Sequence, residues 1–226
     1  MKPRLLDLFS GAGGAAKGYQ RAGFYVVGVD IKPQPHYCGD EFYQADALTF
    51  PLDSYDAYHA SPPCQGYSRL QIAGKTYPKL IEPTRQSLTQ TGLSFVIENV
   101  VGAPLIEPVI LCGSMFGLGV WRHRLFETHG FQVVQPQCSH TEHPYPLDVT
   151  GTGGPCLSRT TPGGGIHRKP RNMAQASEAM GIDWMTRKEL TQAIPPAYTE
   201  FIGGYLMKAV KKGIVGQNTL SPLKQE

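Results

Sequence analysis

The stretch Arg4-Leu5-Leu6-Asp7-Leu8-Phe9-Ser10-Gly11-Ala12-Gly13-Gly14 decides the expected fold of this chain. Its apolar first part predicts a buried strand, and residues 15–22 predict a helix that Gly23 closes. Glycines between a strand and a helix let the backbone turn sharply and let a ligand approach the helix N-terminus, although one such turn is a weak signal. The pattern predicts an α/β domain with a Rossmann-like, doubly wound and mostly parallel sheet.

Composition fits one soluble globular domain with a small appended lobe. The chain has 226 residues, of which 41% are hydrophobic and 17% are charged, and its formal net charge is +3. No apolar run approaches the roughly 20 residues that a membrane span needs, and the first residues run into a strand rather than a signal peptide. Five cysteines without disulfide-type spacing fit a reducing compartment. We therefore expect a cytoplasmic monomer with no membrane partner.

A thiol follows two prolines in Ser61-Pro62-Pro63-Cys64-Gln65-Gly66. Proline fixes φ and disfavours helix in the residue before it, so the approach to Cys64 is expected to be rigid and extended. A strand predicted over residues 55–60 would place this loop at the edge of the sheet. On these residues alone, Cys64 fits a nucleophile and an inert core cysteine about equally well. The polar residues 69–82, with Gly74 near their centre, are a candidate lid over the thiol.

Several predicted strands end in or near polar side chains. These are Asp7, Asp30 at the end of residues 24–30, Asp46 in residues 41–47, and Glu98-Asn99 after residues 93–97. The carboxyl ends of parallel strands share one edge of a sheet, so we expect these side chains to line one cleft with the thiol. Asp30 suits the two hydroxyls of a ribose, or it simply caps a loop.

Residues 121–128 predict a strand in which alternation puts Arg122 and Arg124 on one face, with Leu125 and Phe126 near the core. Two arginines on one face can clamp a phosphate or a carboxylate. A solvated strand face is the alternative.

From residue 130 to 172, glycines interrupt every regular pattern and predict an irregular lobe or long loop. Residues 151–177 contain no acidic residue and four basic ones, namely Arg159, Arg168, Lys169 and Arg171. This segment is a candidate phosphate-contacting surface or a solvated loop. The run Cys138-Ser139-His140-Thr141-Glu142-His143, with Cys156 further on, offers metal ligands, but its spacing matches no zinc signature, and no metal is expected.

Regular structure is expected again after this lobe. Helices are predicted over residues 173–180 and 186–192, and an amphipathic helix over 197–212 follows Pro195-Pro196. The polar tail from Gly213 is expected to fray. We thus expect a catalytic domain over 1–129, a lobe over 130–172, helices over 173–212 that pack back on the domain, and a flexible tail over 213–226.

Several blocks of the chain, taken in order, resemble the DNA (cytosine-5) methyltransferases, of which this would be a short prokaryotic or phage-type member. The matching blocks are Asp7 to Gly14, Asp30 and Asp46, Pro62-Pro63-Cys64-Gln65, Glu98-Asn99-Val100, Arg122-His123-Arg124, loosely Glu178 to Trp184, and Gln192-Ala193-Ile194-Pro195-Pro196. One block could agree by chance, whereas six in order do not.

The resemblance implies a class I methyltransferase fold with S-adenosylmethionine as cofactor and double-stranded DNA as partner, with the target base flipped out. It implies catalytic roles for Cys64, Glu98, Asn99, Arg122 and Arg124. The cofactor residues implied are Asp7, Phe9, Ser10, Gly11, Ala12, Gly13, Gly14, Asp30, Ile31, Asp46, Ala47, Pro62, Gln192 and Ala193. The DNA contacts expected are Gln65, Ser68, Arg159, Arg168, Lys169 and Arg171.

This chain departs from the family pattern at three places. Thr191-Gln192 stand where the family usually has Gly-Asn, which bears on cofactor affinity and on tolerance of a modified sulfonium group. The segment between the arginines and the ninth block is short, and Trp121 leaves the register of the arginines open.

Four alternatives to a DNA methyltransferase stay open at this stage. They are an RNA cytosine-5 methyltransferase, a relative that transfers a modified group, a non-catalytic nucleic-acid-binding relative, and an unrelated nucleotide-binding α/β protein. A role in restriction, in protection or in another process is equally open.

Overall fold

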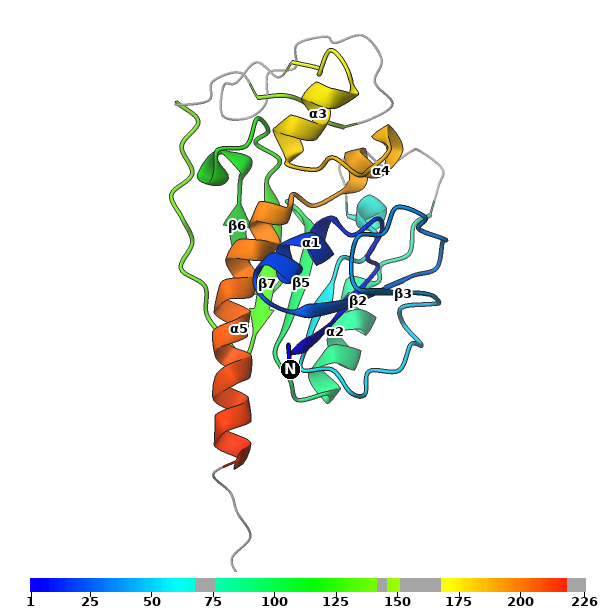
Figure 1. Cartoon of the computed structure of the whole chain (residues 1–226), viewed down its shortest axis with the longest axis vertical. Coiled ribbons are helices and arrows are strands. Elements are labelled where there is room, and N and C mark those ends of the chain that lie inside the picture. Colours follow the sequence, from blue (N-terminus) through cyan, green and yellow to red (C-terminus); the bar gives the residue numbers. More distant parts are fainter. Residues whose placement is uncertain (68–75, 142–145, 151–167, 219–226) are drawn as a thin grey trace, which may run out of the picture.

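The computed structural model describes residues 1–67, 76–141, 146–150 and 168–218. These residues form one central sheet with helices on both faces (Figure 1). The strands are β1 (Arg4–Leu8), β2 (Tyr25–Asp30), β3 (Glu41–Gln44), β4 (Ala57–Ala60), β5 (Phe95–Val100), β6 (Val109–Leu111) and β7 (Arg124–His129). Their order in the sheet is β3-β2-β1-β4-β5-β7-β6, and only β7 runs antiparallel to its neighbours. The expected doubly wound, mostly parallel sheet is confirmed.

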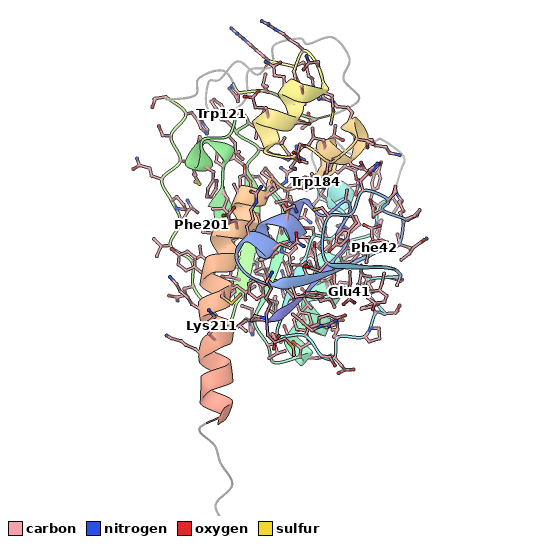
Figure 2. The ribbon with its side chains drawn as sticks, viewed as in Figure 1. Glu41, Phe42, Trp121, Trp184, Phe201 and Lys211 are labelled. Atoms are coloured by element: carbon pink, nitrogen blue, oxygen red, sulfur yellow. The ribbon has the colours of Figure 1, made fainter. Side chains whose placement is uncertain are left out.

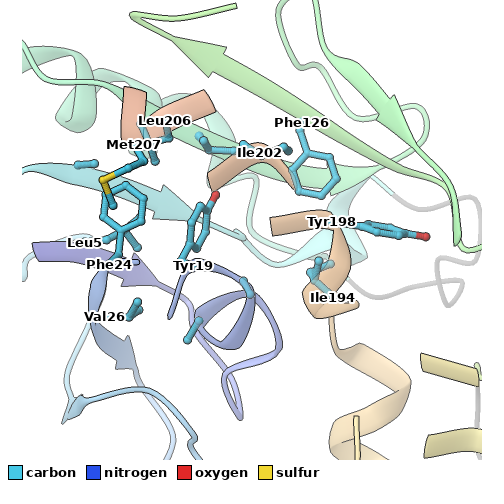
Figure 3. Packing of buried hydrophobic residues seen from close by; sticks show 14 of the residues in the cluster. Leu5, Tyr19, Phe24, Val26, Phe126, Ile194, Tyr198, Ile202, Leu206 and Met207 are labelled. Carbon is cyan, nitrogen blue, oxygen red and sulfur yellow. The ribbon is translucent and has the colours of Figure 1, made fainter. Parts of the chain in front are cut away.

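The central strands are apolar on both faces because helices cover both sides of the sheet. Leu5 of β1 packs in a cluster with α1 (Gly14–Arg21) and α5 (Pro196–Asn218), to which Tyr19 and Ile202 belong (Figure 3). Leu6, next in the chain, points to the opposite face, where Leu88 of α2 (Ile81–Gln90) packs.

The helices α1 and α5 approach each other closely because glycines lie between them. A Cβ added to Gly18 of α1 would lie 2.1 Å from Thr199 Oγ1 and 2.2 Å from the carbonyl oxygen of Pro196. Thr199 Oγ1 also donates a hydrogen bond of 2.8 Å to the carbonyl of Ala15, which satisfies the hydroxyl in this buried contact. The final helix is therefore fixed against the helix that follows the Gly-rich turn.

A separate group of elements lies at the carboxyl end of the parallel strands and contains α3 (Met173–Met180) and α4 (Arg187–Gln192) (Figure 1). Asn172 caps α3 by accepting from the Gln175 amide at 2.9 Å, and Thr186 with Glu189 forms a capping box at the start of α4. Two short 3-10 turns, η1 (Cys64–Gly66) and η2 (Gly113–Phe116), complete this end of the molecule.

The structure corrects several expected boundaries. Glu98 and Asn99 lie within β5 rather than after it, and Arg122 precedes β7 rather than lying in it. The last helix continues through Gly213 to Asn218, beyond the expected end at residue 212, because a glycine lowers helix stability by about 1 kcal/mol but stops a helix only when the backbone turns away there. Strand β6 was not predicted.

The described part of residues 130–172 has no named helix or strand and holds one isolated bridge, between Leu147 and Arg168. The proposed domain boundaries remain predictions. None of the described helices is long and apolar enough to cross a bilayer.

The α1 and α5 contact gives a first test. Gly18→Ala should lower the free energy of unfolding by about 1–3 kcal/mol, since the added methyl group overlaps backbone and hydroxyl atoms that cannot move independently. Urea unfolding followed by circular dichroism measures the change.

The matched control is Gly204→Ala in α5, where an added Cβ has no neighbour within 4 Å. This variant should be neutral or more stable by about 0.5–1 kcal/mol, because alanine favours the helix. Equal effects of the two substitutions would mean that the helices are not in this close contact.

Candidate active site

The Cys64 loop follows β4 directly and is held at its base by the neighbouring strand. Cys64 is the first residue of η1 and is half-buried. Asn99 of β5 is buried, and its side-chain amide donates a hydrogen bond of 2.8 Å to the carbonyl of Pro62. Asn99 therefore holds the base of the Cys64 loop against β5.

A buried ion pair lies on the next residue of β5. Glu98 is 5% exposed, and its Oε1 is 3.2 Å from Nε of Arg124 at the start of β7. Burial raises the pKa of the Glu98 carboxyl, while Arg124 and a hydrogen bond from Ser61 oppose the rise. Burial outweighs these opposing contacts, so the pKa of the Glu98 carboxyl lies above its ordinary value.

The thiol shares this electrostatic environment. Burial raises the pKa of Cys64, Arg124 lowers it, and Glu98 raises it. The structure thus brings together Cys64, Glu98 and Arg124, which the sequence placed on three separate elements. A thiol, a carboxyl and a guanidinium thus meet at the carboxyl end of β4 and β5.

Arg122 has a different environment from the one expected. Its guanidinium donates to the carbonyls of Ala193 (3.0 Å), Thr191 (2.7 Å) and Val149 (3.4 Å). Burial lowers its pKa to about 9, which leaves it protonated at neutral pH. The prediction that strand alternation pairs Arg122 with Arg124 as an anion clamp is wrong, because Arg122 lies before the strand at φ 32° and its donors are taken by carbonyls.

The Gly-rich turn after β1 is tied to its surroundings by backbone groups. The Gly11 amide donates to Asp30 Oδ2 at 3.0 Å. Trp184, which is labelled in Figure 2, donates through Nε1 to the carbonyl of Ala12 at 3.0 Å. Gly11 and Gly13 adopt positive φ, at 50° and 85°, as does Phe9 at 59°. The positive φ values and these two hydrogen bonds together fix the path of the turn.

Asp30 caps this turn, and it keeps acceptor capacity for a ligand. Its Oδ1 accepts from the Lys32 amide at 2.9 Å, so each carboxylate oxygen holds one backbone donor. A carboxylate oxygen can accept more than one hydrogen bond, and Asp30 is only half-buried. Both interpretations of this acid from the sequence, loop cap and hydroxyl acceptor, are compatible with its geometry.

The residues after β2 and β3 form the outer part of this edge. Ile31 follows Asp30 and is 66% exposed, which is unusual for a large apolar side chain. Asp46 is exposed and accepts from the Leu48 amide at 2.9 Å, whereas Ala47 is buried. An exposed aliphatic side chain beside two carboxylates suits a ligand with one flat apolar part and one hydroxylated part.

Asp7 does not line the cleft, contrary to expectation. Its side chain is fully buried, and neither carboxylate oxygen has a hydrogen-bond partner among the described residues. Burial, then the nearby charges of Asp30 and Glu98, raise the pKa of Asp7 well above its usual value. Asp7 precedes the last residue of β1, and at that depth its side chain lies under the helices instead of at the strand end.

The Gln192-Ala193-Ile194 block lies against the Gly-rich turn. A Cβ added to Gly14 would lie 2.5 Å from the Ile194 carbonyl oxygen and 3.3 Å from Ala193 Cβ. Gln192 is exposed and Ala193 half-buried at this junction. Segments from the two ends of the chain thus form one wall, with Ser10 buried behind it.

The residues expected to contact nucleic acid are only partly described. Gln65 is exposed in η1, whereas Ser68, Arg159 and the first half of the candidate lid (69–75), including Gly74, lie outside the described residues. Arg168 and Arg171 are exposed, but Lys169 Nζ lies 2.9 Å from Asp148 Oδ2. Lys169 is therefore engaged in an ion pair. Its partner Asp148 lies three residues before the acid-free segment 151–177.

A buried polar chain under the site was not predicted. Tyr19 OH lies 3.0 Å from His59 Nδ1, and His59 Nε2 lies 2.9 Å from Ser61 Oγ, which in turn bonds to Glu98. Burial lowers the pKa of His59 to about 3, so its ring is neutral. One ring nitrogen then donates to one hydroxyl, and the other accepts from the second hydroxyl. The sequence feature that could have predicted this polar chain is the histidine at position 59, which interrupts a largely apolar strand three residues before Pro62.

The strand order, with an antiparallel β7 between β5 and β6 and a Gly-rich turn after β1, is that of the class I S-adenosylmethionine-dependent methyltransferases. The sequence is 34% identical over 195 residues to the Type II methyltransferase M1.HphI of Haemophilus parahaemolyticus. The match covers 65% of this chain and 51% of the relative, so the chain spans about half the length of the curated relative it matches. No family model matches the sequence.

Solved structures of low sequence identity share the fold. A protein of an E. coli prophage described as a DNA modification methyltransferase has a TM-score of 0.63 at 15% identity, covering 95% of this chain and 100% of the other. The Dnmt2 methyltransferase of S. pombe has a TM-score of 0.55 at 13% identity, covering 97% and 100%. The resemblance to DNA methyltransferases drawn from the sequence motifs is confirmed by a curated Type II methyltransferase, and the class I fold by these structures.

The buried Asp7 predicts a pH dependence of stability. Its pKa is raised in the folded state, so the folded chain binds this proton more tightly than the unfolded chain and loses stability as pH rises through the folded pKa. Asp7→Asn cannot titrate. Between the unfolded and the folded pKa of Asp7, the unfolding free energy of the wild type should therefore fall relative to that of Asp7→Asn by up to about 1.4 kcal/mol per pH unit.

Urea unfolding at several pH values between about 5 and 8 measures this difference. The exposed Asp53→Asn controls for the loss of one acidic group. A difference between wild type and Asp7→Asn that stays constant with pH would show that Asp7 is not desolvated.

Proposed function

We propose that this chain transfers a methyl group from S-adenosylmethionine to C5 of cytosine in DNA, through a covalent bond between Cys64 and C6 of the base. The observation that carries this proposal is the meeting of Cys64 with the buried pair of Glu98 and Arg124. The likeness to a relative named as a Type II methyltransferase supports it. The proposed reaction needs both groups in an environment of limited solvent access, and Cys64 is half-buried while Glu98 is buried.

The thiol is required because C5 of cytosine is a weak nucleophile. The thiolate of Cys64 adds to C6, the Sγ–C6 bond forms, and electron density moves to C5. C5 then takes the methyl group, after which the C5 proton leaves to a base and the Sγ–C6 bond breaks to restore the aromatic ring. Cys64 leaves this sequence unchanged, as a catalyst must.

Glu98 acts on the opposite side of the ring. A carboxyl whose pKa is raised by burial can carry or share a proton at neutral pH, and it donates that proton toward N3 as negative charge develops on the base. Ser61 and the buried His59 chain hold the carboxyl in position. Arg124 lies beside both reacting groups and favours the thiolate form of Cys64.

The residues present fit S-adenosylmethionine. The Gly-rich turn offers backbone groups at positive φ, Asp30 suits ribose hydroxyls, and exposed Ile31 suits the flat face of an adenine. The wall formed by Gly14 and Ala193 would border the methionine part. When bound, the cofactor supplies an electrophilic methyl group. Pro62 and the Gly-rich turn both lie at the carboxyl edge of the central strands, β4 and β1, where that group must be presented.

A base inside a duplex cannot reach Cys64, so the target cytosine would be flipped out at a cost of a few kcal/mol. Exposed Gln65 neighbours the thiol in η1 and would contact the DNA from which the base has left. Exposed Arg168 and Arg171 would contact phosphates. Methylation of RNA, transfer of a modified group, and binding without transfer are the outcomes against which the proposal is tested.

The central test uses Cys64→Ala. With labelled S-adenosylmethionine and duplex DNA, this variant should lose transfer by on the order of 10³-fold or more, because no covalent adduct can form. Its affinity for the cofactor should stay within about twofold of the wild type, since the thiol is not part of the cofactor wall. Nucleoside analysis by mass spectrometry should identify 5-methylcytosine.

The control is Cys38→Ser, which removes a second half-buried thiol among the described residues; its Sγ donates to the Gly13 carbonyl. Duplex DNA with 5-fluorocytosine should form an adduct that survives denaturation with the wild type and Cys38→Ser, but not with Cys64→Ala. Full transfer by Cys64→Ala, or label found only in RNA or on another base, would contradict the proposal.

A second test concerns the phosphate contacts. The double variant Arg168→Ala and Arg171→Ala should bind duplex DNA more weakly and lower the slope of log affinity against log salt by about 0.9 for each phosphate that is no longer neutralised. Fluorescence anisotropy at several salt concentrations measures both quantities.

The matched control removes the same charge from the far part of α5, with Lys211→Ala and Lys212→Ala. Lys211 lies on the lower half of that helix, away from α3 and η1 (Figure 2). An equal decrease of slope in both double variants would mean that DNA binding depends on the net charge of the protein and not on contacts of Arg168 and Arg171.

A further inference from the structure

Four side chains with metal-binding atoms meet beside the two arginines. These are Cys112, His123, Cys138 and His140, and one potential ligand atom from each lies within 4.8 Å of all the others. They come from three separate stretches of the chain: the residue before η2, the residue between Arg122 and Arg124, and the segment that follows β7. The proposed reaction uses none of the four.

The spacing of these atoms matches a tetrahedral metal centre. Cys138 Sγ lies 3.1 Å from His140 Nε2 and 3.6 Å from His123 Nε2, and Cys112 Sγ lies 3.4 Å from His140 Nε2. Zinc binds thiolate sulfur at about 2.3 Å and imidazole nitrogen at about 2.0–2.1 Å, which separates a sulfur from a nitrogen by about 3.6 Å in a tetrahedron. Small shifts would let one ion contact all four atoms.

The groups around the cluster hold its members in place. The ring of His140 stacks on buried Trp121, with centroids 3.6 Å apart and planes 9° apart, and Figure 2 shows Trp121 beside the η2 turn. Ser114 Oγ donates to Cys112 Sγ at 3.2 Å, and the Cys112 amide donates to Met115 Sδ at 3.4 Å. Such supporting contacts orient ligands in metal sites.

We propose that Cys112, His123, Cys138 and His140 bind one structural Zn²⁺ ion. Two thiolates and two neutral imidazoles are a donor set that zinc prefers, and four protein ligands leave no open position for a substrate. Binding replaces the two thiol protons, which pass to the solvent. The site is separate from the thiol at Cys64 and from the buried pair at Glu98.

The site would fix the segment that carries both arginines. His123 lies between Arg122, which holds the carbonyls of Thr191 and Ala193, and Arg124, which pairs with Glu98. The other ligands are Cys112, directly before η2, and Cys138 and His140, which lie in the lobe over 130–172. One ion would thus cross-link the catalytic edge of the sheet to that lobe.

No zinc signature is visible in the sequence because the four ligands do not form two close pairs. Only Cys138 and His140 are near each other in the chain, and the expectation of no metal rested on that spacing. His143, Glu142 and Cys156, which the sequence also offered as ligands, lie outside the described residues.

The first test measures metal directly, without any activity assay. Protein purified with Zn²⁺ in the medium should contain about one zinc ion per chain by mass spectrometry of the metal, and Co²⁺ in its place should give the absorption of a tetrahedral site with thiolate-to-metal charge transfer. The variants Cys138→Ser and His140→Ala should lose the ion. Thr141→Ala, which changes the exposed side chain next to His140, should keep it.

The second measurement works even if a ligand variant fails to fold. Removing zinc from the wild type with a chelator should lower its Tm, and adding Zn²⁺ back should restore it, because the ion binds the folded chain preferentially. Wild type that holds well under one ion per chain, with a Tm insensitive to Zn²⁺ and Co²⁺ spectra lacking the thiolate band, would show that the four side chains form only a hydrogen-bonded cluster. Equal metal content in Cys138→Ser and Thr141→Ala would also overturn the proposal.

Discussion

The guanidinium of Arg122 joins three segments that lie far apart in the chain. Its donors hold the carbonyls of Thr191 and Ala193, just before the last helix, and Val149 in the segment after the sheet. A planar group with five donors suits such a role, because it satisfies several buried carbonyls that would otherwise cost free energy. Through it, the wall next to Gly14 keeps a fixed distance from the catalytic strands.

The chemistry at the site depends on one cation shared by two groups with opposite needs. In the proposed reaction, Cys64 would react as the thiolate, whereas Glu98 would stabilise the base in its protonated form. Burial favours the protonated form of both, and Arg124 favours the ionised form of both. One cation therefore opposes the effect of burial on both groups.

Buried polar groups distinguish this end of the sheet from the rest of the core. Asp7, His59 and Asn99 are all fully or almost fully buried, yet they have different functions. Asn99 anchors a loop and His59 supports a carboxyl. Asp7 has no partner among the described residues, and burial with the nearby charges of Asp30 and Glu98 raises its pKa. Each lies within two or three residues of the carboxyl end of its strand, where open α/β sheets place their function.

Local patterns were sufficient to predict most of the elements and the residue types of the site. The Gly-rich turn after an apolar strand, the apolar runs of β2 and β5, and the capped helix at Met173–Met180 depend on a few neighbouring residues, so their physics is local. Cys64, Glu98 and the arginines likewise stand in recognisable blocks. The short strand β6 and the end of α5 were missed because propensity there is weak and packing decides.

The role of each site residue became apparent only from the packing of the whole chain. Arg122 holds carbonyls instead of clamping an anion, Asp7 lies in the core instead of the cleft, and Lys169 pairs with Asp148. The same packing gathers Cys112, His123, Cys138 and His140 into one cluster. The reason is physical: burial and partner choice depend on atoms that lie far apart in the chain and meet only when the sheet and its helices pack together.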